Sequence, residues 1–235
     1  MRLSAPIYQL KRRAKLLARE EKIPLHQAQN RIAAKESFTA WSLLASRFEA
    51  GTDVASLLPE LADGDMLLLG ARLGHGKTRL GLQLLLDAAG AGRRSVFFTL
   101  EYTEREAMEH IRALADNSPG GMSEIVTSDE ISADFIVRHL SGAPKGTVAV
   151  IDYLQTLDQQ RRKPPLFEQM KVLQALTRST GVILGFISQI ERSYNPEYTS
   201  VPGFADLRLP NPIPPGMFSK ACFLNADEVR LQNLT

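Results

Sequence analysis

The sequence predicts an α/β fold in which a mostly parallel sheet is flanked by helices, with a small helical segment in front of it. From Met66 onward, short apolar runs alternate with segments of helical periodicity, as in parallel sheets that are covered on both faces. The chain of 235 residues is long enough for one such domain and a small appendage. We therefore predict a helical segment over residues 1–50 and an α/β domain over residues 64–235.

The N-terminal segment is expected to form three short helices with one apolar face each. Pro24 is suited to the first turn of the second helix, and the third is expected to begin near Ser37. Residues 1–35 carry nine Lys and Arg side chains against two Glu, whereas the whole chain has a net charge of only +2. Such a basic appendage indicates contact with nucleic acid or an acidic partner, and a solvated helix face is the alternative. The apolar positions are Ile7, Leu10, Ala14 and Leu17, then Leu25, Ala28 and Ile32, and finally Trp41, Leu43, Leu44 and Phe48.

The α/β domain is expected to contain five strands, four helices and a C-terminal hairpin. Thr103 and Glu106 form a capping box, which fixes the start of the second helix and leaves Glu101 at the carboxyl end of its strand. The Pro-rich segment 196–215 is expected to be a surface loop packed by its own contacts, or a disordered one. Residues 221–231 are expected to form a hairpin that adds antiparallel strands to the sheet. The expected strands cover 66–69, 95–100, 124–127, 147–151 and 182–188, and the expected helices cover 77–89, 104–115, 133–140 and 166–179.

Composition excludes several classes of protein. No apolar run is long enough to span a bilayer and the N-terminus has no signal-peptide core, so we expect a cytoplasmic protein without membrane contact. The single cysteine, Cys222, excludes an internal disulfide and a Cys-rich zinc site.

Residues 71–78 carry the most informative motif, Ala-Arg-Leu-Gly-His-Gly-Lys-Thr, between an expected strand and an expected helix. It is close to Gly-x-x-x-x-Gly-Lys-Ser/Thr, in which backbone N–H groups surround the β-phosphate of a nucleoside triphosphate, the lysine reaches the β- and γ-phosphates and the hydroxyl coordinates Mg²⁺. Ala71 replaces the first glycine, which an alanine can do if its φ stays negative. The motif predicts ATP and Mg²⁺ as cofactors, the alternative being a Gly-rich turn that only ends a strand. The expected nucleotide-binding residues are Ala71, Arg72, Leu73, Gly74, His75, Gly76, Lys77 and Thr78.

Three polar residues after other strands complete the expected site, because ligands of parallel sheets bind at the carboxyl edge. Asp152 ends an apolar strand and is expected to hold Mg²⁺ together with Thr78. Glu101 is expected to orient or deprotonate the attacking water in apolar surroundings, the alternative being a solvent-facing acid, while the adjacent Tyr102 could stack on a base or ring. Gln189 is expected to sense the γ-phosphate. Two further basic positions are candidates for contact with a nucleic-acid backbone, namely Arg192 and residues 161–163. The alternative is that they are only solvated loop residues.

The motifs that follow one another between residues 64 and 208 are Ala71-Arg72 with Gly76-Lys77-Thr78, Leu100-Glu101, Ile151-Asp152-Tyr153-Leu154-Gln155, Ser188-Gln189 with Arg192, and Asp206-Leu207-Arg208. In kind and order they resemble the RecA-like ATPase domain of DnaB-type replicative helicases. The resemblance implies that Lys77 and Thr78 hold the phosphates and Mg²⁺ and that Asp152 supports the metal. It also implies that Glu101 activates water and that Gln189 is the γ-phosphate sensor.

The chain departs from that family in two places. After Arg208 the family has an acidic, Gly/Ser-containing stretch and later a Lys-x-Arg that reaches the neighbouring subunit's ATP site, whereas this chain has a Pro-rich loop, a short hairpin and no Lys-x-Arg. It also has only the basic segment in place of the family's larger N-terminal helical domain. The sequence thus predicts a DnaB-like ATPase that acts on DNA, single-stranded DNA above all, and a reduced DNA helicase is one form that it could take. A homo-oligomer is compatible with the sequence, whereas the departures weigh against a hexamer and leave unwinding open. The alternatives are an ATP-dependent switch or adaptor with little turnover, and a nucleotide or sugar kinase.

Overall fold

The computed structural model describes residues 4–5, 7–41, 44, 56–72, 74–115, 123–158, 164–191, 193–194, 201–209, 211, 213–225 and 228–234. The chain divides into two compact units, one of residues 1–53 with 226–228 and one of residues 54–225 with 229–235. Within the described ranges, no helix combines the length and the apolar character that a membrane span requires.

In the N-terminal unit, as far as the structure describes it, two helices bury their apolar faces together. α1 spans Ile7–Glu20 and α2 spans Leu25–Lys35, with Pro24 at the N-cap position of α2. The burial of Leu10 and Ala14 in α1 and of Ala28 and Ile32 in α2 agrees with the periodicity, whereas Leu25 is exposed at the first position of α2. Most of the expected third helix lies outside the described residues. The buried residues of this unit's core are Ala5, Leu10, Ala14, Ile32, Ala33 and Leu44.

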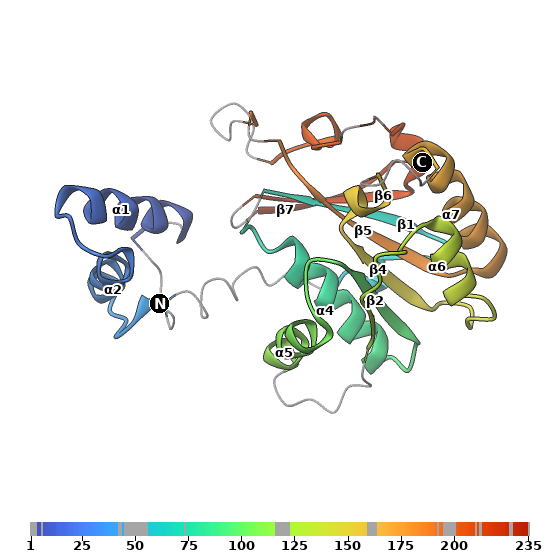
Figure 1. The fold of residues 1–235 in the computed structure, drawn as a ribbon, viewed down its shortest axis with the longest axis horizontal. Coiled ribbons are helices and arrows are strands. Elements are labelled where there is room, and N and C mark those ends of the chain that lie inside the picture. Colours follow the sequence, from blue (N-terminus) through green and yellow to red (C-terminus); the bar gives the residue numbers. More distant parts are fainter. Residues whose placement is uncertain are drawn as a thin grey trace. The chain divides into compact units, whose positions relative to one another are not determined.

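The second unit is built on a seven-stranded sheet of order β3-β2-β4-β5-β1-β6-β7 (Figure 1). The five strand pairs from β3 to β6 are all parallel, as the alternation of strands and helices predicts. β1 pairs with β5 on one side and with β6 on the other, so the strand before the motif of residues 71–78 lies inside the sheet. This motif is called the phosphate loop below, after its predicted role. The strands are β1 (Met66–Ala71), β2 (Ser95–Thr99), β3 (Glu124–Val126), β4 (Val148–Asp152), β5 (Ile183–Gln189), β6 (Lys220–Asn225) and β7 (Glu228–Asn233).

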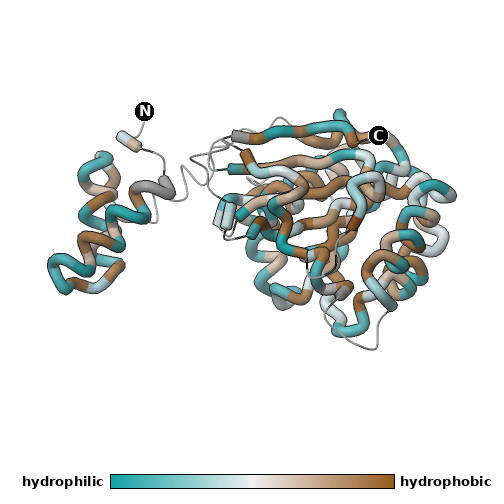
Figure 2. The backbone as a smooth tube through the Cα atoms, turned by 90° about the horizontal axis from the view of Figure 1, so that it is seen from above, coloured by the Kyte–Doolittle hydropathy of each residue, from teal (hydrophilic) through white to brown (hydrophobic). Residues whose placement is uncertain are grey.

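Helices cover both faces of this sheet, which confirms the predicted α/β fold (Figure 1). Because side chains alternate along a strand, the strands supply two separate cores. One core includes Leu67 and Phe97 and lies under α4 and α5, and the other includes Leu68 and Phe98 and lies under α6 and α7. Figure 2 shows that most strands are hydrophobic along their length, as expected for strands buried on both faces. The helices are α4 (Lys77–Gly90), α5 (Glu104–Leu114), α6 (Ala133–His139) and α7 (Leu166–Thr180), and the 3₁₀ turns are Leu58–Glu60, Leu154–Asp158, Phe204–Asp206 and Pro215–Met217.

The C-terminal strands differ from the prediction in one respect. β6 and β7 are neighbours at the edge of the sheet, and the Leu234 amide donates to the Ser219 carbonyl at 2.9 Å, as in the expected hairpin. However, β6 runs parallel to β1, with Leu67 opposite Lys220. The prediction that β6 is antiparallel is wrong, because the preceding segment first returns to the amino edge of the sheet. In its described part this segment packs on the core through Val201, Leu207, Ile213 and Phe218.

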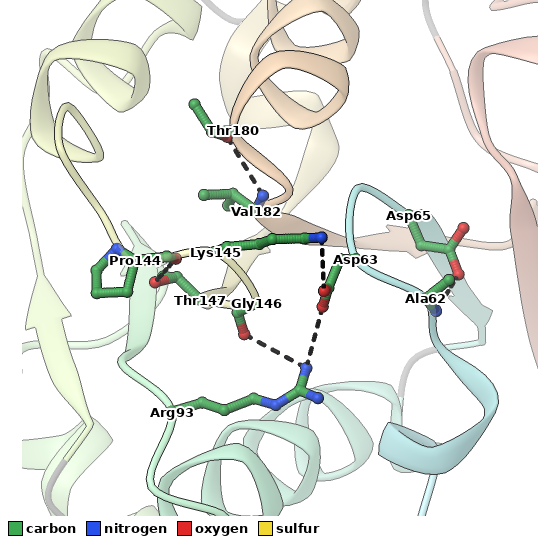
Figure 3. A network of polar contacts seen from close by, with 10 residues as sticks. All are labelled: Ala62, Asp63, Asp65, Arg93, Pro144, Lys145, Gly146, Thr147, Thr180 and Val182. Atoms are coloured by element: carbon green, nitrogen blue, oxygen red, sulfur yellow. Dashed lines mark hydrogen bonds and ion pairs between the residues drawn. The ribbon is translucent and has the colours of Figure 1, made fainter.

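A polar network joins the segments before four strands at the amino edge of the sheet, and Figure 3 shows its ion pairs. The Asp63 carboxylate before β1 pairs with Arg93 before β2 and with Lys145 before β4, each at 3.6 Å. The Gly181 carbonyl before β5 accepts the Gly146 amide at 3.1 Å. The ionic side chains are partly exposed, so they align the strand starts but contribute little free energy of unfolding. The carboxyl edge, where the phosphate loop begins, is the opposite edge of the sheet.

Candidate nucleotide-binding site

The phosphate loop connects β1 to α4 at the carboxyl edge of the sheet. Gly74 and Gly76 have φ angles of +80° and +84°, in the left-handed region that glycine adopts without steric cost. Between them, the His75 amide donates to the Arg72 carbonyl at 3.2 Å and closes a turn. Leu73 lies outside the described residues. The two glycines therefore curl the backbone ahead of α4, as a loop that cradles an anion requires.

Ala71 occupies the position of the first glycine in the motif Gly-x-x-x-x-Gly-Lys-Ser/Thr. It is the last residue of β1 and is fully buried. Its carbonyl accepts the Ile190 amide at 3.1 Å. An extended strand residue does not need the conformational freedom of glycine, so alanine fits this position.

Lys77, Thr78 and Asp152 come together where α4 begins and β4 ends. The Thr78 Oγ1 donates to the Asp152 Oδ2 at 3.2 Å. Burial raises the pKa of Asp152 to about 6, while the Lys77 charge and the Thr78 hydrogen bond oppose this rise. Burial also lowers the pKa of Lys77, and the charges of Asp152 and Glu101 oppose that change. Lys77 and Asp152 are both buried beside the phosphate loop, and the charge of each acts on the pKa of the other.

The donor atoms at this point fit a magnesium ion. Mg²⁺ prefers oxygen ligands and is held in phosphate sites by one or two protein oxygens together with waters and phosphate oxygens. The Thr78 hydroxyl and the Asp152 carboxylate supply two such oxygens. In the described part of the chain, no group of three or more His, Cys, Asp and Glu side chains gathers to form a metal site of its own.

Glu101 lies two residues after the end of β2, and its amide donates to the Thr99 Oγ1 at 3.1 Å. The predicted capping box is confirmed, because the Thr103 Oγ1 accepts the Glu106 amide and the Glu106 carboxylate accepts the Thr103 amide. The charge of Glu101 acts on Lys77, the lysine of the phosphate loop, and tends to raise its pKa. Its side chain is exposed, and the expectation of apolar surroundings is wrong. The strand residues before it point into the two cores instead.

Tyr102 has a place in this site that the sequence did not reveal. Burial, and after it the Asp152 charge, raise the pKa of Tyr102, and the Thr78 side chain opposes the rise. The ring meets the edge of the His110 ring of α5 at a centroid distance of 5.0 Å. Its position next to Glu101 in the sequence was the signal that could have indicated this role.

Gln189 ends β5 directly opposite Ala71, beside the start of the phosphate loop. Its carbonyl accepts the Arg208 amide at 2.8 Å, and Ile190 forms an antiparallel bridge with Leu207. The Asp206-Leu207-Arg208 motif is therefore hydrogen bonded to the end of the strand that carries Gln189.

Gln155 reinforces this connection and was not singled out from the sequence, although it belongs to the motif that begins at Ile151. It is buried, and its Nε2 donates to the Ser188 Oγ at 3.1 Å and to the Arg208 carbonyl at 2.5 Å. One amide thus ties the turn after β4 to the end of β5 and to the segment beyond it.

Of the predicted basic candidates, Arg192 and residues 161–163 lie outside the described residues. In the N-terminal unit, α1 carries exposed basic side chains. Arg12, Lys15 and Arg19 are exposed and recur at helical spacing on the side away from the buried Leu10 and Ala14.

No protein-family model and no curated protein sequence matches the chain. Among solved structures, the chain is similar to one described as an ATPase domain, with a TM-score of 0.59 and 17% identity over 79% of this chain and 82% of that one. It is also similar to a DnaB-like replicative helicase whose structure was described with its interactions with primase, with a TM-score of 0.59 and 18% identity. That match covers 94% of this chain and 66% of the helicase. The resemblance inferred from the motifs is thereby confirmed as a likeness of fold: the chain has the RecA-like α/β fold of DnaB-like ATPase domains.

Proposed function

We propose that this protein is a Mg²⁺-dependent ATPase that acts on DNA. The observation that carries the proposal is the meeting of Lys77, Thr78 and Asp152 at the end of a phosphate loop on the carboxyl edge of a parallel sheet. The N-terminal end of α4 faces the loop, and the peptide dipoles of a helix favour an anion there. A triphosphate would be bound by the loop amides and by the Lys77 ammonium.

Each residue of the site has a separate role in hydrolysis. Thr78 and Asp152 would hold Mg²⁺, which, when bound, neutralises the charge that develops on the phosphate oxygens. Glu101 orients and deprotonates the attacking water, and the action of its charge on Lys77 supports this role. Gln189 senses the γ-phosphate, and its hydrogen bond to Arg208 passes that signal to the segment beyond β5.

The N-terminal unit supports the assignment to DNA. α1 uses its apolar face against α2, so the face that remains for a partner carries Arg12, Lys15 and Arg19. Cations spaced along one helix can displace counterions from a phosphate backbone without reading its sequence. We propose single-stranded DNA as the ligand of this face.

The experiment that tests the function is the rate of ATP hydrolysis with and without single-stranded DNA. A several-fold stimulation supports the DNA-directed ATPase, and the mass of the protein with ATP and DNA present shows whether copies assemble. Tight ATP binding without turnover would instead support an ATP-dependent switch or adaptor. Transfer of phosphate to a small acceptor would indicate a kinase.

A further inference from the structure

Gln155 and Gln169 are both buried, but their amides are paired differently. The Nε2 of Gln169 donates to the Leu157 and Pro164 carbonyls at 2.6 and 2.8 Å. Its Oε1 accepts the Ala133 amide at 3.0 Å, so both ends of this amide have partners. Gln155 uses only its Nε2, because its Oε1 is buried and no group in the described part of the chain donates to it. An unpaired buried acceptor costs free energy, so stability alone does not explain the placement of Gln155.

The Arg208 carbonyl fixes the orientation of the Gln155 amide. A carbonyl can only accept, so the Nε2 end of the amide has to face it, at 2.5 Å. The Ser188 hydroxyl, 3.1 Å from the same Nε2, can donate or accept and would therefore pair with either end of the amide. The contact that requires this orientation, and that leaves Oε1 without a partner, is thus the one between Gln155 and Arg208.

Arg208 is held on both sides by segments that end at the candidate nucleotide-binding site. Its amide donates to the carbonyl of Gln189, the last residue of β5, at 2.8 Å. Its carbonyl accepts from Gln155, which follows Asp152 by three residues in the turn after β4. Asp152 is the proposed metal ligand and Gln189 is the proposed γ-phosphate sensor. The backbone of Arg208 is therefore bonded to both strand ends that a nucleotide would contact.

The turn that precedes Arg208 is bonded within itself and to the end of β5. The Gly203 amide donates to the Asp206 carboxylate at 2.8 Å, and the Gly203 carbonyl accepts the Asp206 amide at 3.1 Å. The Asp206 carbonyl in turn accepts the Glu191 amide at 2.7 Å. A displacement of Arg208 is therefore expected to move this turn with it.

We propose that Gln155 is a positioning residue that couples the segment of residues 203–209 to the metal end of β4. Through its contact with Arg208, the segment responds to bound Mg²⁺ and ATP by a second route, in addition to the one through Gln189. The inference rests on the proposed function, because it requires a nucleotide and its metal at the ends of β4 and β5. Gln155 is buried and bonded to Ser188 and Arg208, so it acts through these neighbours.

The test measures hydrogen exchange of the backbone amides of residues 203–209 in the full chain, free and with a non-hydrolysable ATP analogue and Mg²⁺. In the wild type, exchange in this segment should differ between the two states. Gln155→Met keeps the length of the side chain and loses the amide, and we expect the difference to fall by at least about threefold, the factor for loss of one modest hydrogen bond. Gln155→Asn keeps the amide but is shorter by one methylene group, so it should show the same loss and serves if the Met variant does not fold. Equilibrium binding of the analogue to the same samples shows that the site is occupied.

Two controls separate this role from stability and from the Ser188 contact. Ser188→Ala leaves the contact between Gln155 and Arg208 in place, so it should keep the wild-type difference in exchange. Ser95→Ala removes a buried hydrogen bond with the Ser123 hydroxyl at the opposite edge of the sheet, and it should keep the difference as well.

A full difference in exchange in Gln155→Met overturns the inference, and so does an equal loss in Ser188→Ala. A wild type that binds the analogue without any change in residues 203–209 also overturns it, but leaves the proposed ATP site in place. A wild type that binds no nucleotide at all would instead overturn the proposed function, and this inference with it.

Discussion

The Thr78 hydroxyl donates a hydrogen bond to the Asp152 carboxylate at 3.2 Å and joins two residues that stand 74 positions apart in the sequence. One comes from the first turn of α4 and the other from the last position of β4. The parallel arrangement of β1 and β4 around β5 brings both to the same edge of the sheet. The phosphate loop and the predicted metal ligand are therefore parts of one site.

Replacing Glu101 by Gln should keep ATP binding and lower turnover by roughly 10²- to 10⁴-fold, the range for loss of a general base. The amide keeps the shape of the side chain but cannot accept the proton of water. The measurement is steady-state hydrolysis together with equilibrium binding, and Glu104→Gln, three residues on in the first turn of α5, is a matched control. Unchanged turnover in the Glu101 variant would show that Glu101 is not the base.

Asp152 should make the free energy of unfolding fall as pH rises from about 4 to about 6. Its pKa is raised from 3.8 to about 6 in the folded chain, so in this window the folded state binds more protons than the unfolded state. Glu106 and Glu124 have lowered pKa values and act in the opposite direction, so the effect is read as a difference from Asp152→Asn. Urea unfolding without metal should give a more negative pH slope in the wild type than in the Asn variant. An equal slope in both proteins would contradict the raised pKa.

Gln155→Leu should lower the free energy of unfolding by about 1–3 kcal/mol, because buried polar atoms lose their partner. Its Nε2 serves both the Ser188 hydroxyl and the Arg208 carbonyl. Gln174→Leu is the control, since that amide makes only long contacts of 3.4 and 3.5 Å. The measurement is the free energy of unfolding of both variants by chemical denaturation. Equal free energies of unfolding would show that the Gln155 contacts do not stabilise the fold.

Replacing Arg12, Lys15 and Arg19 together by Gln should weaken binding of single-stranded DNA and flatten its salt dependence by about two units of the log–log slope. Glutamine is also a good helix former, so α1 should persist. Lys171→Gln, on an exposed position of α7, should leave the slope unchanged. If the triple variant changes the mass of the assembly but not the slope, the basic face of α1 binds a protein instead of DNA.

The strands and helices of the α/β domain could be predicted because each is a local pattern. The strand from Val148 and the helix from Lys77 begin and end within one or two residues of the expected positions. The direction of β6 could not be predicted, because it depends on where the chain travels between Val201 and Phe218, and no local pattern records that path.

The candidate site was predictable where a residue type carries the chemistry by itself. Lys77, Thr78 and Asp152 were placed by the motif and by the carboxyl-edge rule for parallel sheets. The contacts of Tyr102 and Gln155 were not, because a tyrosine or a buried glutamine acquires its role only from the neighbours that the fold supplies. The exposure of Glu101 was also missed, since alternate strand residues point into the two cores and leave the turn after β2 open.

The central claim is that Lys77, Thr78 and Asp152 form a site for the phosphates of ATP, and equilibrium binding of ATP to Lys77→Ala tests it most directly. Arg79→Ala, two residues further along α4, is the matched control. The account predicts that folded Lys77→Ala protein loses nearly all ATP affinity, because the ammonium charge and its hydrogen bonds to the β- and γ-phosphates disappear together. Wild-type ATP affinity in a folded Lys77→Ala protein would contradict it.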